Sequence, residues 1–482
     1  MNKTIRRASV FALLLVLALL LRATWVQFHD STALADDKHN RRNVMAQYAN
    51  PLGDIIVGGE AITGSQRTKG GDLAYKRTYK DGDLYSPITG YSSQVYGATQ
   101  LEGIYKDLLD GTDNRLKNPL DALTNKRADP GDVITTIDPA VQKAGYKALG
   151  DTKGAAVAID PKTGKILGMV STPSYDPSRI SGSTDSKAWR ELTTDKEKPM
   201  VNRALRQPLP PGSTFKLVVA AAALEDGLYG SVDERTSSPN PYTLPGTRTV
   251  LKNENQSAPC ENANIRTALQ YSCNNVFAKM AVDLGQDKVK AMADKMGFNT
   301  DKLDVPVRAG KSVYPSDMDK AQTALSGIGQ FDVTATPLQM SMVSAAIANG
   351  GVLAKPHMVS QISDSGGDVL EKYDDGTSQR VMDASTAEGL QSAMQTVVEK
   401  GTGTNARISG ATVGGKTGTA QHGENNSKTP YAWFTSYAKG SDGKEVAVAV
   451  MIESSSAARD EVSGNGLAAP IAKAMMAAGL KS

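Results

Sequence analysis

The chain of 482 residues has few of the residues that commonly bind metals and little excess charge of either sign. It contains only 2 cysteines and 4 histidines, and their spacing matches no known metal site. Basic residues exceed acidic residues by only 3, and no long basic run lies beyond the N-terminus, which argues against nucleic-acid binding. No internal repeat is visible. With a hydrophobic share of 40%, the chain is long enough for two or three packed domains.

The N-terminus carries a membrane signal. An uncharged, mostly apolar stretch spans residues 8–21 and is followed by Arg22; three basic residues precede it, namely Lys3, Arg6 and Arg7. A spanning helix needs about 20 apolar residues, so the Arg22 side chain would have to extend to the outer interface. The basic residues favour a single-pass anchor over residues 1–29, with its N-terminus in the cytoplasm.

A cleaved signal peptide is the alternative interpretation of this stretch. Ala33-Leu34-Ala35 has the small-residue pattern of a cleavage site. The polar gap from Arg22 to Thr32 is long for a cleavage region, so the anchor is favoured. Both interpretations place the remainder of the chain outside the cytoplasm.

A serine and a lysine stand one helical turn apart in Ser213-Thr214-Phe215-Lys216. The apolar run 217–224 that follows stops before Gly227, which predicts a helix beginning near Ser213. Such a helix places Ser213 and Lys216 on one face. A partly desolvated lysine beside a second cation has a lowered pKa, so it can accept the serine proton. The helix N-terminus also favours an oxyanion, although this motif alone is common by chance.

A second motif, S-x-N, follows as Ser272-Cys273-Asn274. The Ser272 hydroxyl can relay a proton to a leaving amine. The Asn274 side chain offers a donor and an acceptor to a substrate amide. This motif therefore supplies the groups that a serine acyl transferase needs for the leaving group and for substrate binding.

A third motif, K-T-G, lies in Lys416-Thr417-Gly418-Thr419. Lys416 would supply the second cation that keeps Lys216 neutral. Thr417 and Thr419 offer hydroxyls to a substrate carboxylate. Gly418 has no side chain, so a peptide could lie along this strand edge as an added strand.

The same region matches the P-loop pattern of nucleotide-binding proteins. Residues 410–417 satisfy G-x-x-x-x-G-K-[ST] letter for letter. A P-loop is followed by a helix, whereas residues 418–423 cannot begin a stable one. Nucleotide binding is therefore disfavoured.

The ordered trio S-x-x-K, S-x-N and K-T-G is typical of penicillin-binding proteins and class A β-lactamases. Over nearly its whole length the chain resembles the class B penicillin-binding proteins, and within them a short actinobacterial type. The resemblance extends to segments outside the motifs, namely 132–138, 154–164, 327–330, 336–340, 348–351 and 432–434. One departure is Leu52, which stands where the family usually has arginine in the turn 51–55 and bears on how the N-terminal region packs.

The resemblance implies an α+β fold with a penicillin-binding, serine β-lactamase-like transpeptidase domain, in which helices flank an antiparallel sheet. Strand patterns and turn residues agree with it at 157–159, 166–170, 414–419, 432–437 and 446–452, with helices between 213 and about 400 and a closing helix at 466–480. We expect an anchor over 1–29, an extended, dimerisation-like pedestal domain over 30–130 and the transpeptidase domain over 131–482.

The resemblance also implies a serine-type D,D-transpeptidase that needs no cofactor. Ser213 would attack the carbonyl between two terminal D-alanines while Lys216 takes its proton, and Ser272 would pass a proton to the departing D-alanine. The oxyanion would be held by the backbone N–H groups of Ser213 and Thr419. The implied partners are peptidoglycan stem peptides, β-lactam antibiotics, the membrane and a glycan polymerase of the shape, elongation, division and sporulation family, with no nucleic acid.

Cys260 and Cys273 are the only cysteines. Export would permit a disulfide, and closing so short a loop stabilises by roughly 3 kcal/mol in the chain-entropy model. A bridge at Cys273 would pin the loop between Ser272 and Asn274. Two buried thiols are the alternative.

Two other functions share part of this pattern. A β-lactamase needs a carboxylate that activates water for rapid deacylation, and no clear glutamate loop of that kind lies between Asn274 and Lys416. A non-catalytic scaffold or drug sensor would not need the motif side chains, yet all of them are intact. A scaffold role can coexist with catalysis.

Overall fold

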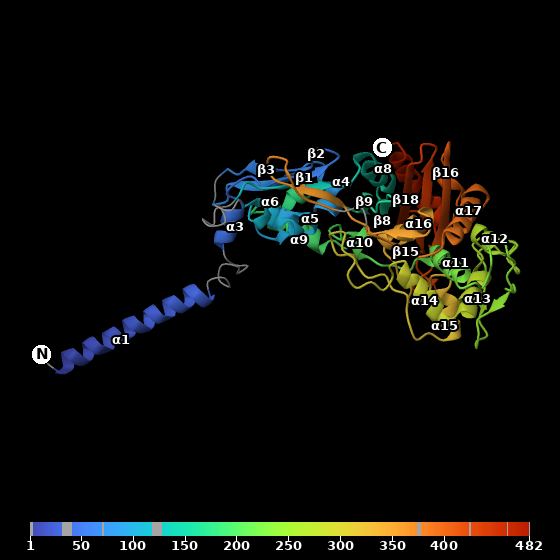
Figure 1. Cartoon of the computed structure of the whole chain (residues 1–482), viewed down its shortest axis with the longest axis horizontal. Coiled ribbons are helices and arrows are strands. Elements are labelled where there is room, and N and C mark those ends of the chain that lie inside the picture. Colours follow the sequence, from blue (N-terminus) through green and yellow to red (C-terminus); the bar gives the residue numbers. More distant parts are fainter. Residues whose placement is uncertain are drawn as a thin grey trace.

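The computed structural model describes residues 3–30, 41–69, 72–117, 128–373, 377–423, 426–459 and 461–481. Figure 1 shows an N-terminal helix standing apart from an elongated body. One end of the body is formed mainly by N-terminal strands and helices, and the other end by the large sheet and its helices. The alternative cleavage site at Ala33-Leu34-Ala35 lies outside the described residues.

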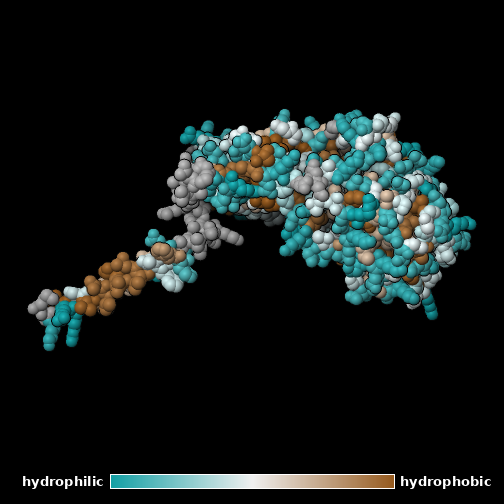
Figure 2. Space-filling view, viewed as in Figure 1, coloured by the Kyte–Doolittle hydropathy of each residue, from teal (hydrophilic) through white to brown (hydrophobic). Residues whose placement is uncertain are grey.

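The N-terminal segment is a single long apolar rod. Helix α1 (Lys3–Trp25) continues into the π-helical turn η1 (Val26–Asp30), and together they are long and apolar enough to cross a membrane. None of the α1 residues is buried against the rest of the chain, and Figure 2 shows its hydrophobic surface facing outward. Water does not favour so large an apolar surface, so the segment is suited to a lipid bilayer.

The large sheet is antiparallel, as predicted. Its strand order is β16-β17-β18-β8-β9, which brings the last three long strands of the chain beside an early hairpin. Strands β8 and β18, which lie inside the sheet, are nearly continuous apolar runs because helices cover both faces. Their bounds are β8 (Lys153–Ile159), β9 (Ile166–Thr172), β16 (Ala411–Ala420), β17 (Tyr431–Gly440) and β18 (Glu445–Ser454).

Helices pack on both faces of this sheet. Helix α16 (Pro337–Ala348) is buried almost all round on one face, in the larger hydrophobic core. Helices α8 (Pro139–Leu149) and α18 (Ala469–Gly479) cover the other face. The other α-helices after residue 130 are α9 (Ser186–Thr194), α10 (Arg203–Arg206), α11 (Lys216–Glu225), α12 (Ile265–Gln270), α13 (Asn274–Leu284), α14 (Gln286–Lys295), α15 (Lys320–Ser326) and α17 (Ala384–Lys400).

A second sheet joins segments that are far apart in the sequence. Its order is β14-β13-β7-β1-β2, and β1 (Ile55–Val57) pairs in parallel with β7 (Asp132–Thr135). Strands β13 (Val359–Ser363) and β14 (Val369–Lys372) come from the C-terminal half of the chain and add to the other side of β7. The expected domain boundary at residue 130 therefore separates β1 and β2 from the other three strands of this sheet.

The N-terminal part of the body, called the pedestal below (residues 41–117 as described, with β7, β13 and β14), has many short elements. Residues 100–109 form two short helices that are separated at Tyr105. The elements are α3 (Arg41–Gln47), β2 (Glu60–Ala61), β3 (Thr63–Arg67), β4 (Tyr75–Tyr79), α4 (Gly82–Thr89), β5 (Ser92–Ser93), β6 (Gly97–Ala98), α5 (Gln100–Ile104), α6 (Lys106–Leu109) and η2 (Asn114–Leu116). Short strands elsewhere are β10 (Tyr242–Thr243), β11 (Val250–Leu251), β12 (Val352–Ala354) and β15 (Ser378–Arg380).

A buried ion pair lies in the pedestal core. The Arg77 guanidinium of β4 is fully buried; its Nε donates to Glu102 Oε1 at 2.6 Å, and its Nη1 donates to the Gly53 carbonyl at 2.7 Å. Leu52, the residue that departs from the family pattern, is itself buried. The turn that lacks its usual arginine is therefore held by an arginine from a neighbouring strand.

Candidate active site

The first motif lies where a short 3-10 turn becomes a helix. Turn η4 (Gly212–Phe215) leads directly into α11, so the predicted helix is correct except for its first turn. Gly212 has a φ of 53°, a conformation that glycine adopts at little cost. A side chain on Gly329 would come within 2.1 Å of the Gly212 carbonyl oxygen, so these two glycines let the backbone around Ser213 pack closely.

Both motif lysines are completely buried, and they converge on Ser272. Lys216 Nζ donates to the Ser272 carbonyl at 2.8 Å and lies 3.2 Å from its Oγ. Lys416 Nζ donates to the same Oγ at 3.0 Å and to the Thr417 carbonyl at 2.9 Å. The three motifs, far apart in the sequence, therefore meet at one hydroxyl.

The Ser213 hydroxyl makes no hydrogen bond to any other described residue, and its residue is 6% exposed. The expected bond to Lys216 is not formed, because Lys216 Nζ also donates to Asn274 Oδ1 at 2.7 Å. Catalytic hydrogen bonds are commonly long in unliganded enzymes and shorten when substrate binds. In the unliganded structure the Lys216 amine is therefore held by neighbouring acceptors and not by Ser213.

Burial lowers the pKa of Lys216 well below its ordinary value, and repulsion by Lys416 lowers it further. Burial also lowers the pKa of Lys416, to about 7. The second cation acts in the predicted direction, but burial is the larger cause. Among the described residues, no carboxylate forms an ion pair with either amine, and the charge of Glu254 opposes the effect of burial only in part.

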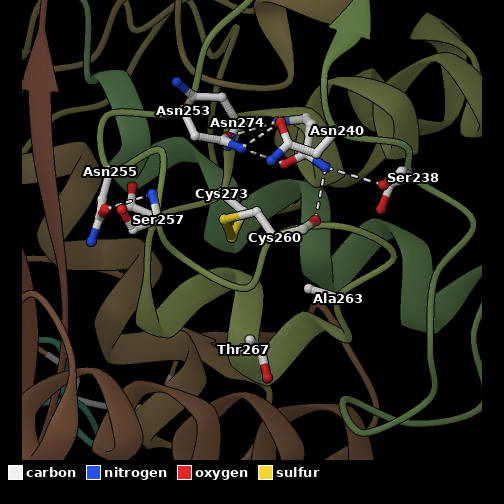
Figure 3. Close-up of a disulfide and its surroundings, with 12 residues drawn as sticks. Ser238, Asn240, Asn253, Asn255, Ser257, Cys260, Ala263, Thr267, Cys273 and Asn274 are labelled. Atoms are coloured by element: carbon white, nitrogen blue, oxygen red, sulfur yellow. Dashed lines mark hydrogen bonds between the residues drawn. A yellow bond between two sulfur atoms is a disulfide. The ribbon is translucent and has the colours of Figure 1, made fainter.

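The S-x-N loop is held in an uncommon conformation. Ser272 has a φ of 59°, in the left-handed region that non-glycine residues rarely adopt. Cys273 is bonded to Cys260, so the structure contains the disulfide that the sequence left open. The neighbouring Asn253 accepts from the Asn274 backbone N–H at 2.6 Å (Figure 3). Strain of this kind persists only where the surroundings fix the backbone.

Asparagine side chains extend this support around the disulfide. Asn275 Nδ2 donates to the carbonyls of Cys260 at 2.8 Å and Ser238 at 3.1 Å, and Asn253 Nδ2 donates to Asn275 Oδ1 at 3.0 Å. The Asn274 side-chain amide is the group expected to bind substrate. Here its Oδ1 accepts from Lys216 Nζ, and its Nδ2 donates to the Lys252 carbonyl. Asn253 and Asn275 had no recognisable signal in the sequence, because their roles arise only from folding.

The third motif lies in β16, the edge strand of the large sheet. Lys416 is therefore in mid-strand, which is incompatible with the P-loop alternative. A Cβ on Gly418 would lie 2.8 Å from the Pro211 carbonyl oxygen and 3.0 Å from Thr214 Cγ2. The absence of a side chain at Gly418 therefore lets the first motif pack against this strand, and its expected role toward the substrate stays a prediction.

The two threonines of the third motif differ in their surroundings. Thr417 is mostly buried, and its Oγ1 lies 2.7 Å from Thr402 Oγ1, a contact that the sequence did not reveal. Thr419 is partly exposed near the end of the same strand. Both lie on the strand that pairs only with β17 among the described strands, so its outer edge is open to an added peptide.

A serine one helical turn before a buried lysine, a second buried lysine and an open strand edge are the features expected of a serine acyl transferase that uses lysine as the base. Comparison with known families agrees. The penicillin-binding protein transpeptidase domain matches residues 154–477, and the penicillin-binding protein A dimerisation domain matches residues 52–133.

Individual relatives match over the full length. The chain is 35% identical to the peptidoglycan D,D-transpeptidase PbpA of Mycolicibacterium smegmatis over 495 residues, covering 100% of this chain and 99% of the relative. The PbpA of Mycobacterium tuberculosis is 34% identical, with the same coverage. A ceftriaxone acyl-enzyme of penicillin-binding protein A from M. tuberculosis superposes with a TM-score of 0.83 at 33% identity, covering 90% of this chain and 100% of the other.

The chain belongs to the penicillin-binding protein transpeptidase family, and within it to the peptidoglycan D,D-transpeptidases.

Proposed function

We propose that the chain cross-links peptidoglycan stem peptides through an acyl-enzyme on Ser213. The observation that supports it most strongly is the convergence of Lys216 and Lys416 on Ser272 Oγ at 3.2 and 3.0 Å. A buried amine whose pKa is lowered is a base at neutral pH, and the adjacent hydroxyl is a path for its proton.

Acylation follows from these positions. Neutral Lys216 leaves the Asn274 oxygen and takes the Ser213 proton as the serine oxygen attacks the carbonyl between two D-alanines. The backbone N–H groups of Ser213 and Thr419 hold the oxyanion. The C–N bond then breaks, and the proton passes from Lys216 through Ser272 to the departing D-alanine. Asn274, Lys416, Thr417, Gly418 and Thr419 form the wall that binds the donor peptide and its carboxylate.

Deacylation uses the same groups in reverse. An amine of a second stem peptide attacks the ester carbon and gives one proton through Ser272 to neutral Lys216. The bond to Ser213 Oγ then breaks, and Lys216 passes that proton to the Ser213 oxygen. β-Lactams imitate the terminal dipeptide and acylate Ser213. Relatives captured as acyl-enzymes with imipenem and penicillin G support this inhibition.

The N-terminal helix anchors the enzyme. The basic residues before the apolar stretch favour a cytoplasmic N-terminus and an extracytoplasmic catalytic body. We propose the division into an anchor (1–29), a pedestal domain (30–130) and a transpeptidase domain (131–482), with β13 and β14 completing the pedestal sheet. The glycan polymerase partner rests on the family resemblance, and copurification from crosslinked membranes tests it.

Labelling with fluorescent penicillin tests the nucleophile. The full chain in detergent should be labelled, and the modified peptide should contain Ser213. Ser213→Ala should abolish labelling, whereas Ser257→Ala, at an exposed serine, should leave it unchanged. Labelling retained in Ser213→Ala would contradict the assignment, and release of the acyl group within seconds would favour the β-lactamase alternative.

A further inference from the structure

Helix α13, which begins at Asn274 of the S-x-N motif, lacks a capping side chain of its own. The residue before it is Cys273, whose sulfur is bonded to Cys260 and makes no hydrogen bond to the helix backbone. The first backbone N–H groups of a helix have no partner within it, and a side-chain oxygen just before the helix usually accepts from them. The start of α13 therefore depends on another segment for these bonds.

Asn253 supplies the cap from 21 residues earlier in the chain. Its Oδ1 accepts from the backbone N–H of Asn274 at 2.6 Å (Figure 3) and from that of Asn275 at 3.3 Å. Its Nδ2 donates to the side-chain oxygens of Asn275 at 3.0 Å and Asn240 at 3.3 Å. Asn253 is 6% exposed, so its loss would leave buried groups without partners. Both polar atoms of this amide therefore help to fix the start of α13.

The same segment also orients the side chain of Asn274. The Lys252 carbonyl accepts from Asn274 Nδ2 at 2.9 Å, which leaves the Oδ1 end of that amide facing Lys216. Lys216 Nζ donates to this oxygen at 2.7 Å. With the amide reversed, the lysine would lose this acceptor. Residues 252 and 253 thus determine where Asn274 lies and which of its atoms the lysine meets.

The position of Lys216 depends on this arrangement. Its amine is held by Asn274 Oδ1 and the Ser272 carbonyl, and both acceptors come from the segment that leads into α13. Both would move if the start of α13 moved. A displacement of about 1 Å can slow a reaction about a hundredfold. The rate of acylation should therefore depend on how firmly the start of this helix is held.

We propose that Asn253 is a positioning residue for the acylation of Ser213 and acts on Lys216 through Asn274. This inference rests on the proposed function. The hydrogen bonds of Asn253 to the described residues reach neither Ser213 nor Lys216. Its loss leaves the base present but displaced. The chemical step should therefore slow, while binding of a β-lactam along the K-T-G strand is retained.

Stopped-flow labelling with fluorescent penicillin tests the proposal. The full chain in detergent is mixed with a series of penicillin concentrations, which gives the limiting rate, the half-saturating concentration and the final labelled amount. Asn253→Ala should lower the limiting rate about thirtyfold and leave the half-saturating concentration within about twofold of the original. Asn253→Asp keeps an acceptor for the two backbone N–H groups, so its limiting rate should exceed that of Asn253→Ala at least about fivefold.

The labelled amount separates positioning from folding. Unfolded molecules lower this amount, whereas a displaced base lowers the rate of the molecules that do react. If Asn253→Ala is recovered unfolded, Asn253→Ser takes its place. The serine hydroxyl is one bond shorter and should reach only one of the two N–H groups, so the limiting rate should fall about tenfold.

Asp138→Ala is the matched control. The Asp138 carboxylate caps α8 in the same way, since its Oδ1 accepts from the backbone N–H groups of Ala140 at 2.7 Å and Val141 at 3.0 Å. Helix α8 lies on the face of the large sheet opposite α16 and contains none of the three motifs. This variant loses two cap bonds as well, but it should be labelled at the original limiting rate.

The outcomes distinguish the two claims. If the original chain is not labelled at Ser213, the proposed function fails and this inference fails with it. If the original is labelled but the Asn253 variants keep its limiting rate and lose only labelled amount, the inference alone is overturned, because Asn253 is then structural. An unchanged limiting rate with a higher half-saturating concentration would also overturn it, and so would an Asn253→Asp variant as slow as Asn253→Ala.

Discussion

The pedestal and the catalytic body both bury cations, but they treat them in opposite ways. Burial disfavours the charge on Arg77, yet the ion pair with Glu102 more than offsets it, so the Arg77 pKa is raised. Lys216 and Lys416 are equally buried, and their partners are hydroxyl, amide and carbonyl oxygens. Their pKa values fall.

Under the proposed function, this difference separates a structural charge from a catalytic one. A buried cation with a carboxylate partner stays ionised and joins elements together. A buried amine that has only neutral acceptors gives up its proton near neutral pH and becomes a base. The residue types suit these roles, since arginine stays protonated whereas lysine titrates readily when buried.

The largest effect is expected where the catalytic amine is made to resemble the pedestal cation. Lys216→Arg keeps the positive charge but removes the base, so penicillin acylation should slow about a thousandfold. Stopped-flow labelling measures this rate. Lys279→Arg, at a partly exposed lysine paired with Asp283 on α13, is the matched control and should react normally. Near-normal acylation in Lys216→Arg would mean that another group is the base.

Removing the partner of the pedestal cation should give the next largest effect. Glu102→Ala leaves the buried Arg77 charge with only its longer ion pair to Asp54, at 3.6 Å, and should lower the free energy of unfolding by about 3–5 kcal/mol. Denaturant unfolding followed by circular dichroism measures it.

Two controls define this result. Glu60→Ala, which breaks the exposed pair with Lys80, should change nothing measurable. The double variant Arg77→Met, Glu102→Leu should recover most of the loss, because an apolar pair needs no compensation. A single Glu102→Ala variant as stable as the original would show that Arg77 tolerates burial without Glu102.

Changing the pH should give the smallest of these effects, and it tests the charge states of the two kinds of buried cation. Because the base must be neutral, acylation should rise about tenfold per pH unit below the pKa of the lysine pair and then level off. The pKa of Lys416 is about 7 in the folded state and near 10.5 in the unfolded state, so between these pH values the unfolded state binds more protons. The free energy of unfolding should therefore rise with pH across it.

Arg77 provides the internal reference for that experiment. Its pKa is raised by folding, and it is protonated in both states over the same pH range. Arg77 therefore does not contribute to the change of unfolding free energy with pH. A Lys416→Met variant should lose part of the rise in unfolding free energy, whereas Arg77→Met, Glu102→Leu should retain it. A flat profile in the original chain would show that Lys416 stays charged.

The sequence allowed the motifs and the long strands to be predicted, because each depends on neighbouring residues. The hairpin β8–β9, the strands β16 to β18 and the closing helix α18 all lie where apolar patterns placed them. The left-handed Ser272, the bond from Lys216 to Asn274 and the packing of Gly418 against Thr214 arise only when distant segments meet. No local sequence pattern indicated these three features.

The shared sheet was missed for the same reason. Strands β1, β7 and β13 are short, and their pairing joins the beginning of the chain to its C-terminal half. Nothing within residues 359–363 indicated a partner near residue 133. Arg77 was also missed, because its contact with the Gly53 carbonyl forms only when the two segments fold together.

The pairing of β1 with β7 determines how the protein can be cut for inhibitor screening. A fragment beginning at residue 131 would remove β1 and β2 and leave one side of β7 with unpaired backbone groups. Bare strand edges recruit other chains, so such a fragment would aggregate. A soluble version for crystallography should therefore begin before Ile55 and omit only the membrane helix and the segment after it.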